Sequence, residues 1–381
     1  MPHTKTLNLR KGPAVFATDE STIDGMTEKG AEPQVDALHL LFYKASRHYK
    51  EFCAMTAAVR LGIFDALDVP LSLHGLCDAC KLLPPSTTHL LELLCELGLL
   101  QRREGQYRNT PLSALYLVSS SPLFQGAVMR DIQNGFALWD RLDRALQKGP
   151  IAVEEEAFFE NGLVDSLAAE ILCGELQKTV EAVASVPAFK QARSLLDLGG
   201  GHGLYAIALS RIHPELHATV FDFPDIARKA EEVLAAHGAD RVRFVPGNLF
   251  TDDLGSDHDI IFLSYNPGGK NPALLKRIHD ALKPGGLFVT KHVFYKKGEG
   301  SKDRLLDLEW SLSAFNGVKK GDNIYRFSGD LTWEAHRDLL GRHFTIEETL
   351  EADAFSGHPL AKFGDRVDSR MIIAVKKEGD S

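Results

Sequence analysis

The sequence predicts an α/β protein in which a mainly helical N-terminal domain precedes a doubly wound sheet. The chain has 381 residues, and at roughly 100–200 residues per domain this length suits two domains. From Ala192 onward, strand and helix patterns alternate, which is typical of a parallel sheet with helices on both faces. Before that position, helical periodicity dominates and one short hairpin interrupts it.

Changes in composition divide the chain into four predicted segments. Residues 1–33 mix charged residues with Gly and Pro, and we expect them to be flexible. Residues 34–120 form the helical domain, residues 121–190 a helical connector, and residues 191–381 the domain that contains the sheet. Hydrophobic residues make up 44% and charged residues 25% of the chain, which is typical of a globular protein.

The helical domain has the element order of a winged helix. Apolar residues at three- and four-residue steps in 34–67 predict two helices that end near Gly62. A further helix spans 71–80, and another follows the cap at 86–88. A hairpin then turns at Glu104-Gly105.

A winged helix suggests DNA binding, but the charge of this chain disfavours it. Lys and Arg total 43 and Asp and Glu total 52, so the formal net charge of −9 repels phosphate backbones. The expected recognition helix, between Thr87 and Leu100, has two glutamates and no Lys or Arg. We therefore expect this domain to pack against a second copy of the chain, with a metabolite-sensing DNA-binding regulator as the alternative.

The sequence also predicts a cytoplasmic protein. No stretch approaches the roughly 18 uncharged apolar residues of a membrane span, and residues 1–33 lack the apolar run of a signal peptide. Five cysteines in mostly apolar helical surroundings suit reduced thiols. Cys77 and Cys80 form a C-x-x-C, but no second pair stands at zinc-site spacing, so we expect no metal.

The C-terminal domain is predicted to bind a ligand at the carboxyl ends of its strands. Its expected strands are 194–198, 218–221, 242–245, 259–264 and 287–292, and its expected helices are 204–213, 226–237 and 272–282.

A glycine-rich loop, Asp197-Leu-Gly-Gly-Gly-His-Gly203, follows the first of these strands. Glycine lets the backbone approach a ligand, and the free N–H groups of the next helix attract an anion. Asp222, at the end of the second strand, is placed to accept from both hydroxyls of a ribose. Gly201, Gly203 and Ala206 also satisfy a dinucleotide spacing, so a nicotinamide cofactor stays open at this point.

Four motifs in order resemble those of the Rossmann-like S-adenosylmethionine-dependent methyltransferases. They are the glycine loop 199–203, Phe221-Asp-Phe-Pro224, Gly247-Asn-Leu-Phe250 and Leu282-Lys-Pro-Gly-Gly286. Among these enzymes, the chain resembles the small-molecule O-methyltransferase family that includes the caffeic acid and hydroxyindole enzymes. Arg60-Leu-Gly-Ile-Phe-Asp-Ala-Leu67 and the winged-helix block resemble that family's dimerisation domain. The order of the motifs disfavours a nicotinamide dehydrogenase.

The resemblance implies a homodimeric enzyme that transfers a methyl group from S-adenosylmethionine to a small organic molecule and releases S-adenosylhomocysteine. Asn248 stands where the family commonly has an Asp that contacts the adenine amino group, and its amide oxygen can still accept. The implied cofactor-binding residues are Asp197, Gly199, Gly201, Gly203, Asp222, Phe223, Asn248, Leu249, Phe250 and Ser264.

The sequence departs from the family at the catalytic base. The family typically has a His-Asp pair just after the fourth strand, and its His removes the hydroxyl proton of the acceptor. Here the chain has Leu263-Ser-Tyr-Asn-Pro-Gly-Gly269, without a histidine. His279-Asp280 has the same two residues, but it lies one helix later and is expected to be an exposed pair.

Three interpretations of this departure stay open. We favour an acceptor atom that needs no strong base, such as thioether or thiol sulfur, carbon or nitrogen. Alternatively, a substitute base serves O-methylation of a phenol or hydroxy acid, with Tyr265 and His292 as catalytic candidates. Lastly, the fold holds S-adenosylmethionine for its charge and catalyses a non-methylating reaction such as an elimination or rearrangement.

The acceptor pocket is expected between the sheet and the connector, because aromatic walls with few polar groups suit small organic ligands. Arg130 and Lys291 are candidates to meet an acidic group of the acceptor. The aromatic candidates are Trp139, Phe158, Phe159, Trp310 and Phe315.

Overall fold

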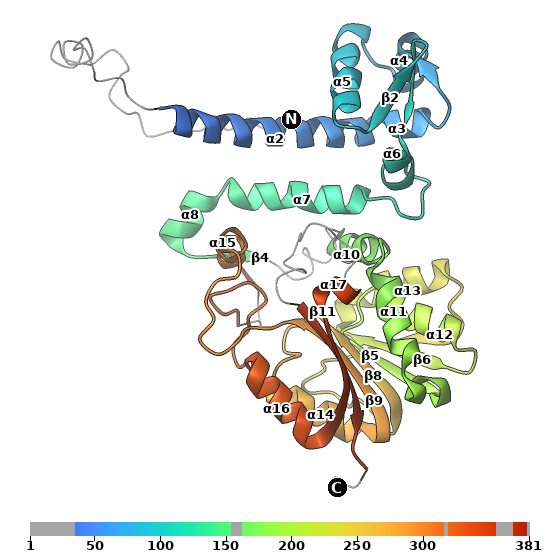
Figure 1. Ribbon diagram of the computed structural model, residues 1–381, viewed down its shortest axis with the longest axis vertical. Coiled ribbons are helices and arrows are strands. Elements are labelled where there is room, and N and C mark those ends of the chain that lie inside the picture. The colour runs from blue at the N-terminus through green and yellow to red at the C-terminus, as the bar shows by residue number, and fades with distance from the viewer. Residues whose placement is uncertain (1–34, 154–161, 316–318, 356–368, 379–381) are drawn as a thin grey trace, which may run out of the picture.

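The computed structural model describes residues 35–153, 162–315, 319–355 and 369–378. A helical N-terminal domain lies at one end, the α/β domain lies at the other, and the long helix α7 runs between them (Figure 1). The predicted flexible segment 1–33 and the candidates Phe158 and Phe159 lie outside the described residues.

The N-terminal domain has the predicted winged-helix order with one more strand. A single helix of 25 residues, α2, replaces the two helices expected before Gly62, and the chain turns at Gly62, whose φ of 68° suits glycine. β1 joins the predicted hairpin, so the sheet has the order β1-β3-β2. The elements are α2 (Asp36–Arg60), α3 (Ile63–Ala66), β1 (Leu71–Ser72), α4 (Leu73–Cys80), α5 (Pro84–Glu96), β2 (Leu100–Arg103), β3 (Gln106–Asn109) and α6 (Pro111–Tyr116).

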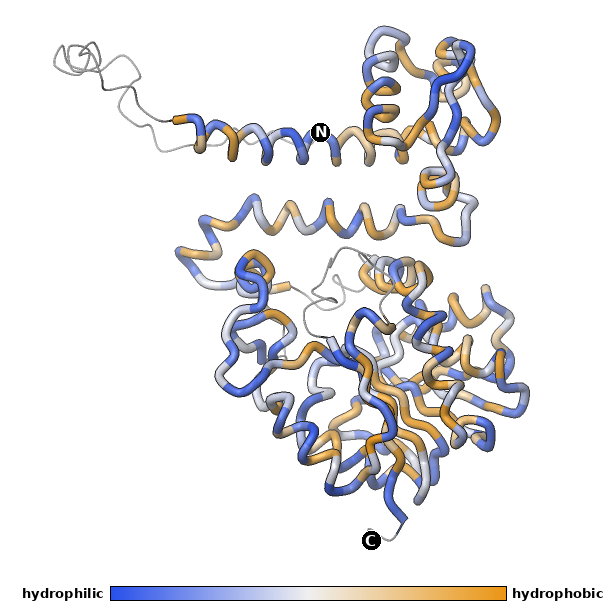
Figure 2. Tube along the Cα trace, in the orientation of Figure 1, coloured by the Kyte–Doolittle hydropathy of each residue, from blue (hydrophilic) through white to orange (hydrophobic). Residues whose placement is uncertain are grey.

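The core of this domain leaves the first half of α2 uncovered. Phe64, Leu91 and Leu94 are fully buried in it. By contrast, Leu41 and Phe42 on α2 are 64% and 61% exposed, and Figure 2 shows hydrophobic residues along this projecting helix. Large apolar side chains gathered on one exposed helix are typical of a protein interface.

The connector is mostly helical, as predicted, but it also carries a strand. β4 (Ile151–Val153) pairs in parallel with β10 (Ser313–Phe315) and ties the connector to the C-terminal domain. The helices are α7 (Gly126–Trp139), α8 (Leu142–Lys148), α10 (Val164–Ile171), α11 (Glu175–Ser185) and the 3₁₀ turn η2 (Pro187–Gln191).

The C-terminal domain contains a seven-stranded sheet with the order β11-β12-β9-β8-β5-β6-β7. The five predicted strands are parallel neighbours, but β12 runs antiparallel between β9 and β11. The sheet is therefore mixed rather than wholly parallel. The strands are β5 (Ser194–Leu198), β6 (His217–Asp222), β7 (Val242–Pro246), β8 (His258–Ser264), β9 (Leu282–Val293), β11 (Phe344–Glu351) and β12 (Ser369–Lys376).

Helices cover both faces of this sheet, which confirms the doubly wound prediction. On one face, Phe262 and Val289 pack among residues of α11 and α12. On the other, Leu263 and Phe288 pack among residues of α14 and α16. The remaining elements are α12 (Leu204–Ile212), η3 (Pro224–Ile226), α13 (Ala227–Ala236), α14 (Pro272–Ala281), α15 (Arg304–Leu312), α16 (Trp333–His343) and α17 (Ala352–Phe355).

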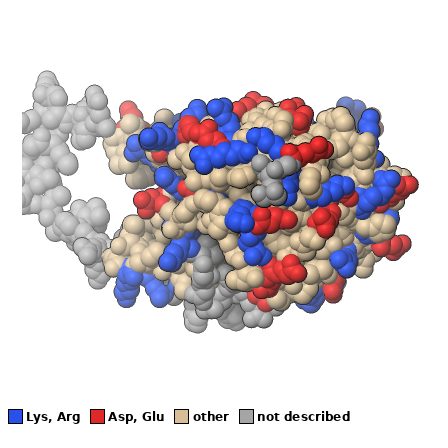
Figure 3. Space-filling model, turned by 90° about the horizontal axis from the view of Figure 1, so that it is seen from below, with Lys and Arg blue, Asp and Glu red and all other residues tan. Residues whose placement is uncertain are grey.

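Three further observations concern the residues that the structure describes. No described helix is both long and apolar enough to cross a membrane. The five cysteines are free thiols, and no three His, Cys, Asp or Glu side chains of the described residues form a group suited to a metal ion. Seen from below, basic and acidic side chains are intermingled, so this face carries no continuous basic patch (Figure 3).

Candidate active site

The glycine-rich loop lies between the carboxyl end of β5 and the first turn of α12. Gly199, Gly201 and Gly203 have φ of 63°, 51° and 69°, a region that other residues rarely adopt. The Gly199 N–H donates to the Phe221 carbonyl over 2.7 Å and fixes the loop to β6. Apart from chain neighbours, no described atom lies within 4 Å of the place for a Cβ on Gly201, so a ligand has room to approach the backbone there.

Asp222 joins this loop to the end of β6. Its Oδ2 accepts from the Gly201 N–H at 2.9 Å, and its Oδ1 accepts from the Phe223 N–H at 2.7 Å. Burial raises the pKa of this carboxyl above its ordinary value, while the two N–H groups oppose that shift. Each oxygen retains a second lone pair. The carboxylate is therefore oriented to accept two further hydroxyl groups from a ligand.

Asp197 lies beneath the glycine loop. Its side chain is 1% exposed, and a Cβ on Gly200 would contact its carboxyl group. Burial and the nearby charge of Asp222 raise the pKa of Asp197 to about 7. Its Oδ2 has no hydrogen-bond partner among the described residues. Because a buried carboxylate is costly without a compensating charge, a cationic group bound above the loop would stabilise it.

The motif after β7 forms a turn that contacts the loop after β8. The Asn248 Oδ1 accepts from the Phe250 N–H at 2.9 Å, and the Asn248 N–H donates to Asp252 Oδ2 at 2.9 Å. Leu249 is buried, whereas Phe250 is 39% exposed with its ring against Gly268. The turn thus connects the end of β7 to the loop that follows β8.

The loop after β8 contacts the glycine loop directly. Ser264 ends β8, and Tyr265 follows with a φ of 49°. The amide of Asn266 occupies the place that a Cβ on Gly199 would need. Residues 264–271 contain no His, Asp or Glu, so this segment itself contributes no imidazole or carboxylate as a base.

His292, a predicted catalytic candidate, lies on the face of the sheet that α14 and α16 cover. Its imidazole packs against Gly269 and lies 6.1 Å from the ring centroid of Phe294, which itself packs among residues of α14 and α16. Burial lowers the pKa of His292 well below its ordinary value, so the ring is neutral. The structure therefore does not bring this histidine together with the glycine loop.

His279 and Asp280 lie near the amino ends of the strands, opposite the glycine loop. They stand in the last turn of α14, which leads directly into the amino end of β9. His279 packs against Phe344, and Asp280 pairs with Lys276 at 2.6 Å. Only Asp280 is well exposed, at 55% of its side chain against 14% for His279. Their distance from the carboxyl ends of the strands agrees with the interpretation that they are no catalytic pair.

A buried ion pair lies below Tyr265 on the face covered by α11 and α12. The fully buried Lys291 Nζ donates to Glu175 Oε1 and, over 2.6 Å, to the Tyr205 hydroxyl. The Tyr205 hydroxyl donates to the same carboxylate oxygen at 3.1 Å. Lys291 Nζ also lies 5.1 Å from the ring centroid of Tyr265. Lys291 therefore pairs with Glu175, and not with the acidic group of an acceptor that the sequence suggested.

Sequence reasoning missed Glu175 and Tyr205. Glu175 stands in the amphipathic helix α11 and Tyr205 in the mostly buried helix α12, where a polar residue on its own gives no signal. The one available signal was Lys291 itself, because a lysine at the end of an otherwise apolar, doubly covered strand requires a buried partner.

Trp310 and Phe315 lie together, as the acceptor-pocket prediction requires. The Lys320 Nζ lies 4.2 Å and 4.6 Å from their ring centroids. This ammonium donates to the Trp310 carbonyl, the Ser313 carbonyl and the Ser313 hydroxyl, each over 2.9 Å. Burial lowers the pKa of Lys320 to about 8. Its three donors are used, so it fixes the aromatic wall in place.

Trp139 and Arg130 lie on α7, further from the strand ends. The Trp139 Nε1 donates to Glu309 Oε2 on α15 over 2.7 Å. Arg130 is exposed, and its Nη1 lies 3.7 Å from the place for a Cβ on Gly162. The first contact joins α7 to α15, and the second places Arg130 beside Gly162, just before α10.

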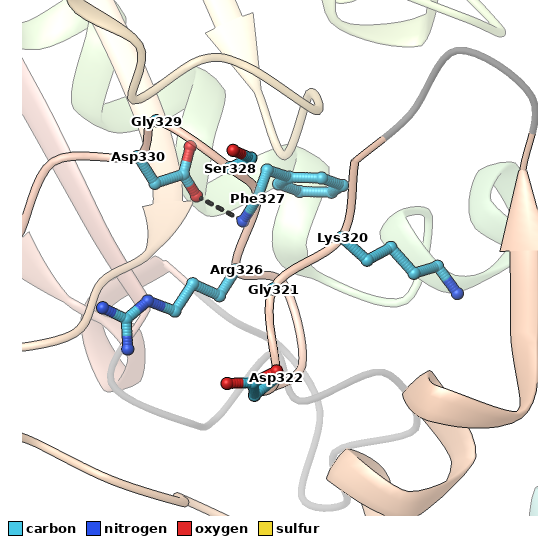
Figure 4. Close-up of a pocket in the computed structure, with 8 residues that line it drawn as sticks. All are labelled: Lys320, Gly321, Asp322, Arg326, Phe327, Ser328, Gly329 and Asp330. Atoms are coloured by element: carbon cyan, nitrogen blue, oxygen red, sulfur yellow. Dashed lines mark hydrogen bonds between the residues drawn. The ribbon is translucent and has the colours of Figure 1, made fainter.

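An open pocket of about 390 Å³ lies in the segment before α16 (Figure 4). The segment is a compact hairpin in which the Gly321 N–H donates to the Arg326 carbonyl at 2.7 Å. The Phe327 N–H donates to Asp330 Oδ2 at 2.9 Å, and Lys320 and Arg326 point to opposite sides (Figure 4). The lining residues are Lys320, Gly321, Asp322, Arg326, Phe327, Ser328, Gly329 and Asp330.

Two family models match this sequence. An O-methyltransferase domain model matches residues 154–326, and an O-methyltransferase dimerisation domain model matches residues 43–119.

Relatives match over much of the chain. An uncharacterised protein from Methanocaldococcus jannaschii is 33% identical over 92% of this chain and 100% of its own length. The tetracenomycin polyketide synthesis 8-O-methyl transferase TcmO from Streptomyces glaucescens is 35% identical over 61% of this chain and 72% of its own. The N,N-dimethyltransferase OxyT from Streptomyces rimosus is 31% identical over 69% and 80%.

Solved structures share the fold. An O-methyltransferase family protein from Burkholderia thailandensis has a TM-score of 0.67 and 20% identity, over 90% of this chain and 98% of that one. Human N-acetylserotonin methyltransferase in complex with S-adenosylmethionine has a TM-score of 0.57 and 22% identity, over 92% and 100%.

Proposed function

Because the chain belongs to the S-adenosylmethionine-dependent O-methyltransferase family, we propose that it methylates a small organic molecule at an atom that needs no histidine base. Membership confirms the resemblance that the four motifs suggested, and with it the methyltransferase activity and the cofactor. The proposal concerns the acceptor, whose reacting atom we take to be nitrogen, sulfur or carbon.

One observation carries this proposal: no imidazole or carboxylate occurs in residues 264–271, which follow the strand of the usual His-Asp pair. A phenol has a pKa near 10 and reacts well only after losing its proton. A neutral amine or thioether attacks with its own lone pair. The N,N-dimethyltransferase among the relatives supports nitrogen as the acceptor atom.

The predicted cofactor residues fit S-adenosylmethionine. The open backbone at Gly201 suits its methionine part, Asp222 its ribose hydroxyls and the exposed Phe250 its adenine. The buried Asp197 carboxyl suits its net positive charge. The cofactor supplies a methyl group on an activated sulfonium, so these residues mainly align the two reactants.

Phenol O-methylation with Tyr265 as a substitute base is the second candidate. The position of Tyr265 directly after Ser264, beside the loop that contacts Gly199, supports it. Relatives named as O-methyltransferases support it as well. The position of His292 on the far face favours Tyr265 over that histidine.

The dimerisation model supports a homodimer, and we expect the exposed apolar side of α2 to be buried in it. We also expect a cytoplasmic enzyme without a nucleic-acid or membrane partner. The net charge of −9 supports the absence of a nucleic-acid partner.

Transfer of a labelled methyl group to a mixed panel tests the function. The panel contains phenols, amines, thiols, thioethers and carboxylates, and the products are read by mass. We expect label on an amine, thiol or thioether and little on phenols. Label confined to phenols would support Tyr265 as base instead, and the Tyr265→Phe variant should then lose it. Bound cofactor without any transfer would mean either that the acceptor lies outside the panel, as a carbon acceptor does, or that the non-methylating alternative applies.

A further inference from the structure

A buried polar cluster lies below the glycine loop, on the face of the sheet that α11 and α12 cover. Asp197 on β5 and Lys291 on β9 stand on either side of β8, and Glu175 and Tyr205 reach them from α11 and α12. All four residues are at most 5% exposed. A buried ion pair adds little stability beyond that of apolar side chains of similar volume. The Lys291–Glu175 pair therefore calls for an explanation other than stability.

Lys291 carries the positive charge of this cluster. The other basic side chain nearby is His202 of the glycine loop, whose ring centroid lies 6.4 Å from that of Tyr205. Burial and the charge of Lys291 lower the pKa of His202 to about 4, so its ring is neutral. Its Nδ1 accepts from the Leu204 N–H at 3.1 Å. The Lys291 ammonium thus acts electrostatically on the loop that faces the cofactor.

Asp197 is the carboxyl group that could compete with Glu175 for this ammonium. Its Oδ2 has no hydrogen-bond partner among the described residues. Burial and Asp222 raise the pKa of Asp197 to about 7, and the Ala206 N–H and the Lys291 ammonium oppose that rise. Ala206 follows Tyr205 on α12, so the groups that contact Asp197 and Lys291 are consecutive in the chain. A lysine has a flexible stem, and without Glu175 it would turn to this second carboxylate.

We propose that Glu175 is a positioning residue that holds the Lys291 ammonium away from Asp197, so that this carboxylate remains available to the positive charge of S-adenosylmethionine. The sulfonium gives this cofactor a net positive charge, whereas the product S-adenosylhomocysteine carries none. Charges in a protein interior act on one another over several ångströms, because little water screens them. Glu175 therefore favours the methyl donor over the spent product. The inference concerns the cofactor and does not depend on the acceptor atom proposed above.

The test compares two ligands that differ in this charge, S-adenosylmethionine and S-adenosylhomocysteine. Their affinities for the full-length protein are measured by calorimetry at pH 8, above the pKa of about 7 of Asp197. The readout is the ratio of the two affinities, because a general disturbance of the site weakens both ligands. Glu175→Gln keeps the size of the side chain and removes its charge. It should lower the affinity for S-adenosylmethionine about fivefold to tenfold relative to S-adenosylhomocysteine.

Two double variants and one control test the route of this effect. Glu175→Gln/Lys291→Met has no freed ammonium and should restore the wild-type ratio. Asp197→Asn should lower the ratio by itself, and adding Glu175→Gln to it should lower the ratio no further. Glu215→Gln removes the carboxylate of an exposed ion pair with Arg193, just before the amino end of β5, and should leave the ratio unchanged.

Tyr205→Phe replaces Glu175→Gln if that variant does not fold. It removes the hydroxyl that accepts from Lys291 and leaves the carboxylate in place, so the ratio should fall about twofold. An unchanged ratio, an equal loss for both ligands, or a low ratio that persists in Glu175→Gln/Lys291→Met would overturn the inference. None of these outcomes bears on the acceptor atom, which the labelled panel tests separately.

Discussion

The surface at the carboxyl ends of β5 and β6 is built differently from the neighbouring surface at the carboxyl ends of β8 and β9. At β5 and β6, backbone groups of the glycine loop form the surface, and Asp222 orients them through two N–H groups. At β8 and β9, side chains form it: the Lys291–Glu175 pair lies beneath, and Tyr265 lies above. A backbone surface depends on a short sequence motif, whereas a side-chain surface depends on residues from distant segments. The comparison predicts different responses to substitution on the two sides.

The largest effect is expected on the side-chain edge. Lys291→Met leaves the Glu175 carboxylate buried without its cation, so the free energy of unfolding should fall by about 3–5 kcal/mol. Urea denaturation measures this. The double variant Lys291→Met/Glu175→Met should regain part of the loss, because it removes the unpaired charge as well.

An exposed ion pair provides the control for that experiment. Lys229 pairs with Asp165 at 2.6 Å, but both side chains are about one-third exposed. Lys229→Met should therefore cost at most about 1 kcal/mol. Losses of similar size for Lys229→Met and Lys291→Met would mean that the buried pair adds nothing particular to this edge.

On the backbone edge, the main effect should be on ligand binding. Asp222→Ala removes the acceptor proposed for the ribose hydroxyls, and two hydrogen bonds to a charged group make a loss of about 100-fold or more in cofactor affinity the expected result. Calorimetry with S-adenosylmethionine measures it. Asp225→Ala, an exposed neighbour, is the control, and retained micromolar affinity in Asp222→Ala would refute the ribose assignment.

The pH dependence of cofactor binding concerns the carboxyl beneath the loop. Burial and Asp222 raise the pKa of Asp197 to about 7, against about 3.9 in the unfolded chain. The native state therefore holds this proton more tightly, and the contribution of Asp197 to stability is lost as pH rises from about 4 through 7.

The cofactor carries a net positive charge and favours the ionised carboxylate. Its affinity should therefore rise about tenfold between pH 6 and 8, as titration calorimetry at several pH values would show. The Asp197→Asn variant should show a flatter profile. A wild-type affinity independent of pH would exclude Asp197 as the group that responds to the cofactor.

The smallest effect is expected at Asn248. Asn248→Asp keeps the oxygen that accepts from the Phe250 N–H and adds a charge facing the proposed adenine site. A charged acceptor forms stronger hydrogen bonds, so cofactor affinity should rise about twofold to threefold. A fall in affinity would indicate that this residue acts only in the local turn.

The strands could be predicted where they are short, apolar and separated by helices. All five parallel strands matched, because strands buried on both faces are continuous apolar runs. β11 and β12 were both missed. β11, Phe-Thr-Ile-Glu-Glu-Thr-Leu-Glu, is largely exposed and has no such run, whereas β12 is buried and apolar but runs antiparallel, outside the alternation of strands and helices. The parallel pairing of β4 with β10 joins segments about 160 residues apart and has no local signal.

The sequence by itself determined the family, the cofactor and the local structure of the glycine loop, since Gly199, Gly201 and Gly203 adopt positive φ and Asp222 accepts from the Gly201 N–H. It also revealed the missing histidine. Only the tertiary structure decided that Lys291 faces Glu175 and that His292 faces away. Adjacent residues on a strand point to opposite faces, and which elements cover each face depends on the packing of the whole chain.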